Sequence, residues 1–313
     1  MWRRVAGSGR RLGTLAGLFG LSLLLWILTP HFLTVSNLLN VLEQTSINAM
    51  VAVGMTFVIV SGGIDLSVGS VLALAGVVLG TLLHEGAPIP VALGGALAVG
   101  ALFGSLSGVM ITWGRLPPFI ATLGMMSIAR GCALLFTEGR PVSGFDPEFR
   151  AIATARIAGI PAPVFVTAAV YLAGHVVLTE TRFGRYVYAV GGNEEATRLS
   201  GVSVRLHKTA VYAVSGLTSA MAAWLLTARL NSAQPIAGIM YELDAIAAVV
   251  IGGTSLVGGE GSLAGTLVGA LIMGVLRNGL NLLSVSSFMQ QVVIGLVIVF
   301  AVLADTVLKS RKP

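Results

Sequence analysis

Residues 58–70, VIVSGGIDLSVGS, interrupt an apolar run that covers residues 49–83. Gly62 and Gly63 stand side by side here, and each glycine in a helix interior costs roughly 1 kcal/mol relative to alanine. Asp65 follows them, although a carboxylate at the centre of a membrane-spanning helix costs at least about 2.5 kcal/mol unless it faces a cavity or a partner. The stretch therefore predicts a break between two short helices.

Two roles are open for Asp65 in this break. In the first, Asp65 or Ser67 caps the following helix by accepting backbone N–H bonds from its first turn. In the second, Asp65 contacts a transported solute or the water of a gate. The two roles can hold together, because a broken helix beside a transport path exposes its backbone to a cavity. We expect the cap first and a substrate contact second.

The 313 residues are 55% hydrophobic and only 10% charged, with a mean hydropathy of +0.91. A soluble domain carries about 25% charged residues, so these residues cannot build a soluble surface. Apolar windows recur along the chain at about the 20 residues that a membrane-spanning helix needs. We expect an all-α polytopic membrane protein with about ten transmembrane helices, some of them short or broken. The expected spans are residues 13–29, 47–61, 66–83, 91–113, 117–137, 161–179, 208–230, 243–257, 262–282 and 287–304.

Lysine and arginine are unequally divided between the two sets of connecting segments. One set holds Arg3, Arg4, Arg10, Arg11, Arg115, Arg182, Arg185, Arg198, Arg205, Lys208, Lys309, Arg311 and Lys312. The other set holds only Arg140, Arg150 and Arg156. The positive-inside rule therefore places both termini in the cytoplasm. The net charge of +6 is explained by this orientation rather than by a nucleic-acid partner.

Residues 1–313 are expected to form a single transmembrane domain with two long connections. On this orientation residues 138–160 lie outside, as a structured loop or a short surface helix, and residues 180–207 form the longest cytoplasmic connection. The chain also repeats weakly, since SGGIDLSVGSVLALAG (61–76) resembles IGGTSLVGGEGSLAG (251–265). The loop count gives both copies the same orientation. A parallel repeat, a wrongly assigned short span and a shared composition all stay open as explanations.

Residues 191–201, GGNEEATRLSG, predict a short amphipathic helix inside the cytoplasmic connection. Asn193 is a favourable N-cap, and Glu194 and Glu195 suit the positive end of the helix dipole. Gly201 is a suitable C-terminal stop, and the glycine pair that precedes Asn193 predicts a turn. A solvated connector explains the local pattern equally well.

Several polar residues in or beside the expected spans have two interpretations each. Arg130 needs a partner or a route to the membrane surface, and Asp65 could supply the opposite charge. Glu242 and Asp244 either begin a helix at the membrane surface or belong to an outer gate. Arg277 either packs between helices or lines a polar path.

Enzymatic signatures are missing from the sequence. It contains no phosphate-binding loop, no Cys/His cluster with metal-ligand spacing and no hydrolase signature. We therefore expect a protein without a catalytic site of its own, and without a metal or other cofactor.

Four blocks of sequence carry a family resemblance. They are GMTFVIVSGGIDLSVGSVLALAG (54–76), PPFIATLGMMSIARG (117–131), TRFGRYVYAVGGNEEATRLSGVSV (181–204) and YELDAIAAVVIGGTSLVGGEGSLAGTLVGALIMGVLRNGL (241–280). In this order they resemble the permease subunits of ABC importers for monosaccharides, and most of all the ribose-type permeases. The resemblance covers about residues 36–306 and is far more specific than any single short motif.

The resemblance implies an import machine in the cytoplasmic (inner) membrane of a bacterium. The permease would work with a second copy of itself or with a related permease, surrounded by membrane lipid. A cytoplasmic ABC ATPase subunit would hydrolyse ATP, which agrees with the missing phosphate loop. A periplasmic or lipid-anchored sugar-binding protein would deliver the sugar, with Arg140, Asp146 and Glu148 of the outer loop as candidate contacts or as solvated loop residues.

The resemblance also gives the glycine breaks and the short helix their expected roles. The helix would fit a groove on the ATPase. The expected coupling residues are Gly192, Asn193, Glu194, Glu195, Arg198, Leu199 and Gly201. The expected elements of the translocation path or gate are Gly62, Gly63, Asp65, Gly252 and Gly253.

Other transport classes stay open at this point. A self-contained secondary transporter would need intramembrane carboxylates for ion coupling, and Asp65 is nearly the only candidate. A passive channel would need no energy source. Related ABC permeases carry an autoinducer-type furanosyl signal, a nucleoside or a branched-chain amino acid instead of a monosaccharide.

Overall fold

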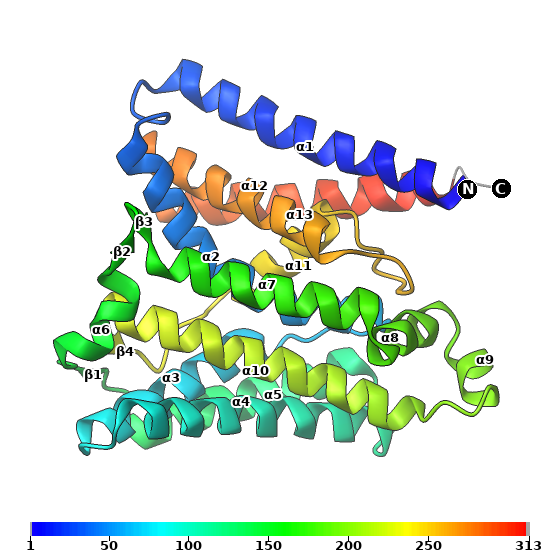
Figure 1. Ribbon diagram of the computed structural model, residues 1–313, viewed down its shortest axis with the longest axis horizontal. Helices are drawn as coiled ribbons and strands as arrows, with labels where there is room; N and C mark the ends of the chain where they lie inside the picture. Colours follow the sequence, from blue (N-terminus) through cyan, green and yellow to red (C-terminus); the bar gives the residue numbers. More distant parts are fainter. Residues whose placement is uncertain (1, 311–313) are drawn as a thin grey trace.

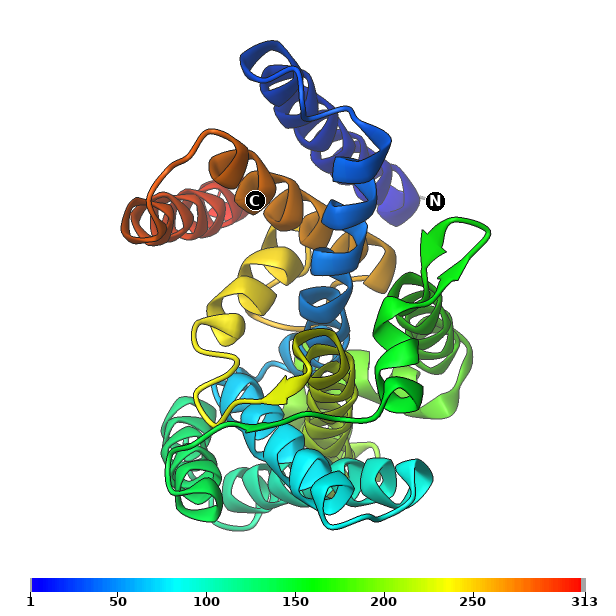
Figure 2. The ribbon, with the colours of Figure 1, turned by 90° about the vertical axis from the view of Figure 1, so that its left-hand side faces the viewer.

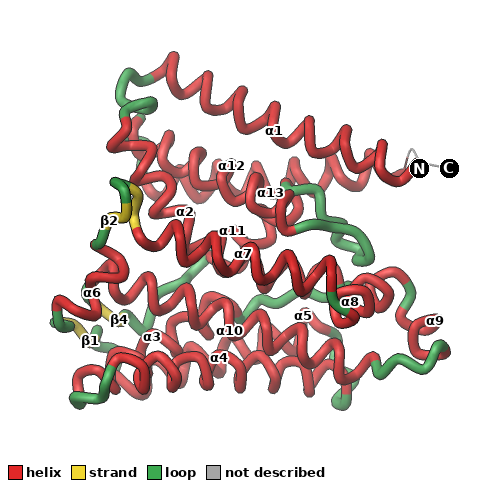
Figure 3. Tube along the Cα trace, in the orientation of Figure 1, coloured by secondary structure: helices red, strands yellow, loops and turns green. Residues whose placement is uncertain are grey.

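The computed structural model describes the backbone of residues 2–310 and the side chains of residues 13–303. Long helices run side by side through the molecule (Figures 1 and 3). They are α1 (Trp2–Leu28), α2 (Val35–Val60), α3 (Val68–His84), α4 (Ile89–Thr112), α5 (Pro118–Thr137), α7 (Ala162–Glu180), α10 (Val204–Leu230), α12 (Leu263–Leu282) and α13 (Ser287–Ser310). The shorter helices are α6 (Pro147–Thr154), α8 (Arg182–Gly192), α9 (Glu194–Leu199) and α11 (Tyr241–Ile251).

Four two-residue strands tie the connecting loops together. β1 (Val142–Ser143) pairs with β4 (Ser232–Ala233), and β2 (Arg156–Ile157) pairs with β3 (Ile160–Pro161), both antiparallel. The first pair fastens the 138–160 loop to the chain that leaves α10. This loop also contains α6, which confirms the prediction of a structured loop or a short surface helix.

Six of the described helices are long and apolar enough to cross a membrane. They are α2, α4, α5, α7, α10 and α12, and shorter apolar helices cover residues 13–28, 68–84 and 287–303. The chain is therefore an all-α, multi-pass membrane protein. Each expected span overlaps a helix of the structure.

Two of the expected span boundaries are wrong, and the local structure gives the physical reason for each. The span expected at 47–61 belongs to α2, which begins at Val35 because Thr34 accepts a hydrogen bond from Asn37 N–H and caps it. The span expected at 243–257 ends at Ile251, where Gly252 and Gly253 stop α11.

The core is built around α2 and α10. All residues of α2 from Ala49 to Val60 are buried, and Figure 2 shows α2 and α10 surrounded by the other helices. α4 packs closely on α10 because glycines remove side chains from the contact: a Cβ on Gly100 or Gly104 would overlap backbone oxygens of α10. Small residues allow such close backbone approach between membrane helices.

The bundle has two distinct ends in Figure 1. We call one the α6 end, because α6 and the paired strands lie there, and the other the α9 end, where α8 and α9 lie with the beginning of α1 and the end of α13. The two long connections, residues 138–160 and 180–207, are therefore at opposite ends. The side chains of the basic residues at positions 3–11 and 309–312 lie outside the described residues.

Candidate functional site

Asp65 is buried just before α3, with 1% of its surface exposed. Its Oδ1 accepts hydrogen bonds from the backbone N–H of Ser67 at 2.9 Å and from the Ser67 hydroxyl at 2.6 Å. Its Oδ2 accepts a hydrogen bond from the Ser215 hydroxyl of α10 at 2.7 Å. The expected side-chain cap is wrong, because Ser67 is the N-cap of α3 without a side-chain cap hydrogen bond, and Asp65 accepts from the N–H of Ser67 itself rather than from the first turn. The carboxylate instead fixes the turn that leads into α3 and ties this turn to α10. Both carboxylate oxygens are occupied by donors of the protein itself.

In each of the two helix breaks, one glycine of the pair has a positive φ and the other makes a close packing contact. Gly62 and Gly253 have φ values of +79° and +89°, which glycine adopts without steric cost. Gly63 and Gly252 allow close contact instead, because an added Cβ would overlap the hydroxyl of Tyr212 or the backbone of α12. Each break therefore needs one glycine for its turn and one for its packing.

The two breaks meet each other beside α8, at a contact that we call the glycine junction (Val60, Gly62, Gly191, Gly258 and Gly259). The N–H of Gly259 donates a hydrogen bond to the carbonyl oxygen of Val60 at 2.9 Å. A Cβ on Gly258 would lie 2.9 Å from the Cα of Gly62, and a Cβ on Gly191 would overlap the same Val60 oxygen.

The predicted short helix of the cytoplasmic connection is confirmed as α9. The side chain of Asn193 accepts a hydrogen bond from the N–H of Ala196 at 2.9 Å and caps the helix. Gly201 follows the helix with φ +83°. Thr197 is buried, whereas Leu199 is 75% exposed. The exposed apolar side chain of Leu199 therefore belongs to a helix at the α9 end of the molecule, where Figure 1 shows α9.

The charged residues of α9 are exposed and paired with neighbours. Arg198 donates to both carboxylate oxygens of Glu195, at 3.0 and 2.6 Å, and Lys208 forms an ion pair with Glu194. The hydrogen bonds from Arg198 hold the pKa of Glu195 below its ordinary value. α9 therefore presents a charged helix surface with one exposed leucine.

α8 was missed by the sequence reasoning, and the turn predicted at Gly191-Gly192 is wrong because both glycines lie in its last turn. Thr181 caps α8 by accepting a hydrogen bond from Gly184 N–H. The buried residues Gly184, Val187 and Val190 follow one another at the three-residue spacing of a helix face, and this spacing was the available signal. The glycine at 191 serves close packing at the junction rather than a turn.

A polar cavity of about 170 Å³ lies between α2, α10, α11 and α12. Arg277 donates to both carboxylate oxygens of Asp244, at 2.8 and 2.6 Å, and Asp244 is 2% exposed. Arg229 forms an ion pair with Glu43 at 2.9 Å. Glu242 and Asp244 both stand in the first turn of α11, as the interpretation as a helix start expects, and Asp244 is in addition buried against Arg277. Glu43 was overlooked because it precedes the span expected at 47–61.

The partner suggested for Arg130 is wrong. Its Nη1 donates to the backbone carbonyl oxygens of Pro235 and Ala237 at 2.6 and 2.7 Å, whereas Asp65 binds two serines. Arg130 therefore holds the loop between β4 and α11 against α5.

Asn278, which follows Arg277 in the sequence, serves helix packing. Its side-chain amide exchanges hydrogen bonds of 2.9 and 2.8 Å with the side-chain amide of Asn37.

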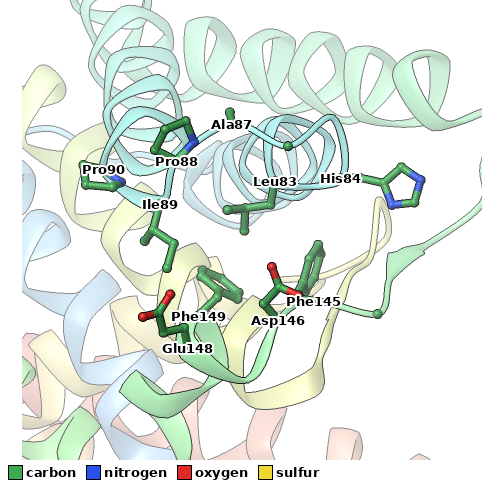
Figure 4. Close-up of a pocket in the computed structure, with 12 residues that line it drawn as sticks. Leu83, His84, Ala87, Pro88, Ile89, Pro90, Phe145, Asp146, Glu148 and Phe149 are labelled. Atoms are coloured by element: carbon green, nitrogen blue, oxygen red, sulfur yellow. The ribbon is translucent and has the colours of Figure 1, made fainter.

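A second, larger cavity of about 630 Å³ opens at the α6 end. Figure 4 shows Leu83 and Ile89 on one side of it, facing Phe145 and Phe149 across the gap. Asp146 and Glu148 of the 138–160 loop also line this cavity; Arg140 is not among its lining residues.

The sequence matches a family model described as "Branched-chain amino acid transport system / permease component" over residues 37–302. The chain is 50% identical over 290 residues to the ribose import permease protein of Haemophilus influenzae, covering 91% of this chain and 90% of that protein. It is 52% identical to the ribose import permease protein of Escherichia coli K12 (89% and 88% covered) and 48% identical to that of Bacillus subtilis (96% and 94% covered). The chain belongs to the family of ABC-importer permeases. No solved structure matches it.

As an ABC-importer permease, the chain is a transport subunit, and the ATPase of such an importer is a separate subunit. The family model covers α2 through most of α13 and leaves out α1. Both helix breaks, α9 and the polar cavity lie inside the matched region.

Proposed function

We propose that this chain forms the membrane pathway of an ABC importer for ribose or a closely related monosaccharide, in the cytoplasmic membrane of a bacterium. The observation that carries the proposal is its identity of about one half to three ribose import permeases over nearly their whole length. The name of the family model refers to branched-chain amino acids, but each of the three ribose permeases is similar over 89–96% of this chain.

The importer would contain three further components. An ABC ATPase hydrolyses ATP on the cytoplasmic side, and a periplasmic or lipid-anchored binding protein delivers the sugar. A second copy of the permease, or a related permease, completes the pathway. The family supports an ATPase and a binding protein in general, and the pairing of permeases is our proposal.

We assign the α9 end to the cytoplasm and the α6 end to the periplasm. The α9 end carries Arg182, Arg185, Arg198, Arg205 and Lys208, whereas the 138–160 loop at the α6 end carries Arg140, Arg150 and Arg156. The positive-inside rule then gives both termini a cytoplasmic location. On this assignment residues 1–313 form one permease domain of about ten spans, in which α3, α11 and other shorter helices complete the six longer ones.

We assign coupling to the ATPase to α9 and its flanks. The residues concerned are Gly192, Asn193, Glu194, Glu195, Arg198, Leu199 and Gly201. The exposed Leu199 and the surrounding ionised side chains suit a groove on another protein, because interface anchors are apolar side chains within a polar rim. α8 connects this helix to the glycine junction, so a displacement of α9 would reach both helix breaks.

We assign the breaks to the gate, as hinges rather than as sugar ligands. Gly62, Gly63, Gly252 and Gly253 provide the turns and the close contacts described above, and Asp65 holds one break to α10. Hinges absorb changes of φ and ψ at a few residues at the ends of elements, and these residues stand at such ends.

The proposal is tested by the energy source of uptake. Vesicles with the permease, its ATPase and its binding protein should accumulate D-ribose only when ATP is present. Uptake that follows an ion gradient without the ATPase would identify a secondary transporter, and equal flux without either source would identify a channel.

A further inference from the structure

Residues 234–240, QPIAGIM, connect β4 to α11 without forming a helix, and we call them the inserted loop. Figure 1 shows this loop in yellow between β4 and α11. A Cβ on Gly80 of α3 would lie 2.7 Å from that of Ala233, whereas Gly238 contacts Gly69 in the first turn of the same helix. Gly80 and Gly69 are about 16 Å apart along α3, at 1.5 Å per residue. The inserted loop therefore descends from the α6 end deep into the bundle.

Arg130 of α5 holds the inserted loop from one side. Its Nη1 donates to the carbonyl oxygens of Pro235 and Ala237 at 2.6 and 2.7 Å, and such charge-assisted hydrogen bonds are stronger than neutral ones. Glu242 of α11 attracts the guanidinium, but Arg130 forms no ion pair with any of residues 13–303. Arg130 lies about 10 Å along α5 from Thr137, where that helix ends at the α6 end. These hydrogen bonds therefore lie within the span.

Two glycines hold the inserted loop at its deepest point. Gly238 has a φ of +72°. A Cβ on Gly238 would overlap the carbonyl oxygen of Gly69, and a Cβ on Gly69 would overlap the carbonyl oxygen of Gly238. Ala237 packs against a cluster that α3 and α5 form, with Val71 and Ala133 among its members. The loop therefore has a defined position between α3 and α5.

The other side of the inserted loop is apolar and exposed. Ile236 is 57% exposed and Ile239 is 60% exposed. Isoleucines on a regular helix could face lipid, but these belong to irregular backbone. Such backbone is tolerated at membrane depth only where it is buried in protein or lines a water-filled cavity, because lipid cannot satisfy its polar groups. The side of the loop that carries Ile236 and Ile239 therefore faces protein or water.

We propose that the inserted loop is the outer gate of the import path, with Ile236 and Ile239 as its apolar barrier and Arg130 as the positioning residue that holds it closed. The inference rests on the proposed function, in which a second permease completes the pathway. Apolar constrictions gate pores by excluding water, and they also oppose the passage of a hydroxylated sugar. The loop enters the bundle from the α6 end, which we assign to the periplasm, so it is an outer gate.

α11 connects this gate to the second helix break. Tyr241 begins α11 directly after the inserted loop, and Gly252 ends the helix at the break. α11 is about 16 Å long, so it forms a short rigid link between the inserted loop and the break that takes part in the glycine junction. A movement at the junction would turn α11 and displace the loop from its position between α3 and α5.

The reaction of introduced cysteines with a membrane-impermeant thiol reagent tests the gate. Cys132, the only native cysteine, is first replaced by serine, and Ile239→Cys is then introduced. Leu172→Cys on α7, where leucine is 66% exposed, is the control for a lipid-facing position. A methanethiosulfonate reacts with the thiolate, which forms in water and not in lipid. Vesicles with the complete importer receive the reagent on the α6 side, without nucleotide or after trapping with ATP and vanadate on the α9 side.

Ile239→Cys should react in at least one of the two states, with rates that differ several-fold between them, and Leu172→Cys should react in neither. Ile236→Cys is the second probe if Ile239→Cys does not assemble. No reaction in either state, or equal rates in both, would overturn the gate if the importer still takes up D-ribose with ATP, and would leave the proposed function intact. Failure of the cysteine-free parent to take up D-ribose with ATP would instead overturn the proposed function.

Arg130→Met in the Ile239→Cys background tests the positioning role of Arg130. Methionine cannot donate to the carbonyl oxygens of the inserted loop, so the reaction without nucleotide should become several-fold faster. Arg130→Lys keeps a charged donor and should bring the rate back toward that of the parent. Gly238→Ala, which also displaces the loop, replaces Arg130→Met if that variant does not assemble. Rates equal to that of the parent would show that these contacts do not hold the gate closed.

Discussion

The backbone N–H of Gly259 donates a hydrogen bond of 2.9 Å to the carbonyl oxygen of Val60, and this bond joins the break after α11 to the end of α2. Gly191 of α8 packs against the same oxygen. The break between α2 and α3, the break between α11 and α12, and α8 thus meet at one backbone contact. If α9 couples to the ATPase as proposed, its movement would reach both breaks through this contact.

Gly191→Ala tests this contact. The added Cβ would overlap the carbonyl oxygen of Val60, and overpacking of a tight contact typically costs about 1–3 kcal/mol. We expect D-ribose uptake to fall strongly while the ATPase still copurifies and hydrolyses ATP. Gly131→Ala on α5 is the control, since nothing lies within 4 Å of a Cβ there. Normal uptake by the Gly191 variant would show that the junction does not transmit the movement.

The double variant Glu194→Arg/Glu195→Arg tests the assignment of α9. It removes the acidic first turn of the helix and both of its ion pairs, and it reverses the charge offered to the ATPase. We expect uptake to be abolished and copurification of the ATPase to be lost, with the permease still folded in the membrane. Glu85→Arg, an exposed residue before α4, is the matched charge reversal. Full transport and normal copurification would exclude α9 as the coupling helix.

Asp65→Asn should be tolerated better than Asp65→Leu. An asparagine oxygen can still accept from the N–H of Ser67, whereas leucine leaves the donors of Ser67 and Ser215 unpaired in a buried turn. Each unpaired buried group costs about 1–3 kcal/mol. The thermal stability of the purified permease and its uptake rate in the importer are the two measurements. Complete loss of uptake in both variants, with stability retained, would point to a role for the negative charge itself.

The Arg277–Asp244 pair is predicted to be structural. Arg277→Met alone should be poorly folded, because it leaves the buried carboxylate of Asp244 without its partner, and breaking one side of a buried ion pair costs about 3–5 kcal/mol. Arg277→Met combined with Asp244→Leu removes both charges of the pair and should restore the yield of folded protein. The yield of folded permease from purified membranes is the measurement. Equal yields from the single and the double variant would contradict the expected cost of the unpaired carboxylate.

The helices of this protein could be predicted because hydropathy is a local property of the chain. Apolar windows located every long helix, and the break at Gly62-Gly63 was visible because two glycines and an acid interrupt such a window. The cap at Asn193 was equally local. Glycines were less reliable as signals of turns. Gly191 was predicted to lie in a turn, but it lies in α8 and packs tightly against Val60.

The polar contacts between helices could not be predicted from the sequence. Asp244 and Arg277 are 33 residues apart, and Glu43 and Arg229 come from opposite halves of the chain. Which side of a helix faces which neighbour depends on its rotation, and a uniformly apolar sequence leaves that rotation undefined. The Arg130–Asp65 pairing failed for the same reason, because backbone carbonyls of a distant loop supply the partner of Arg130.

The central claim is that this chain moves a ribose-type sugar at the expense of ATP hydrolysed by another subunit. The most direct measurement is uptake of labelled D-ribose into vesicles that contain the permease with its ATPase and binding protein, compared with vesicles that contain the permease alone. We expect uptake in the first case only, and only with ATP on the side of α9. D-Ribose accumulation by the permease alone under an ion gradient would contradict the account.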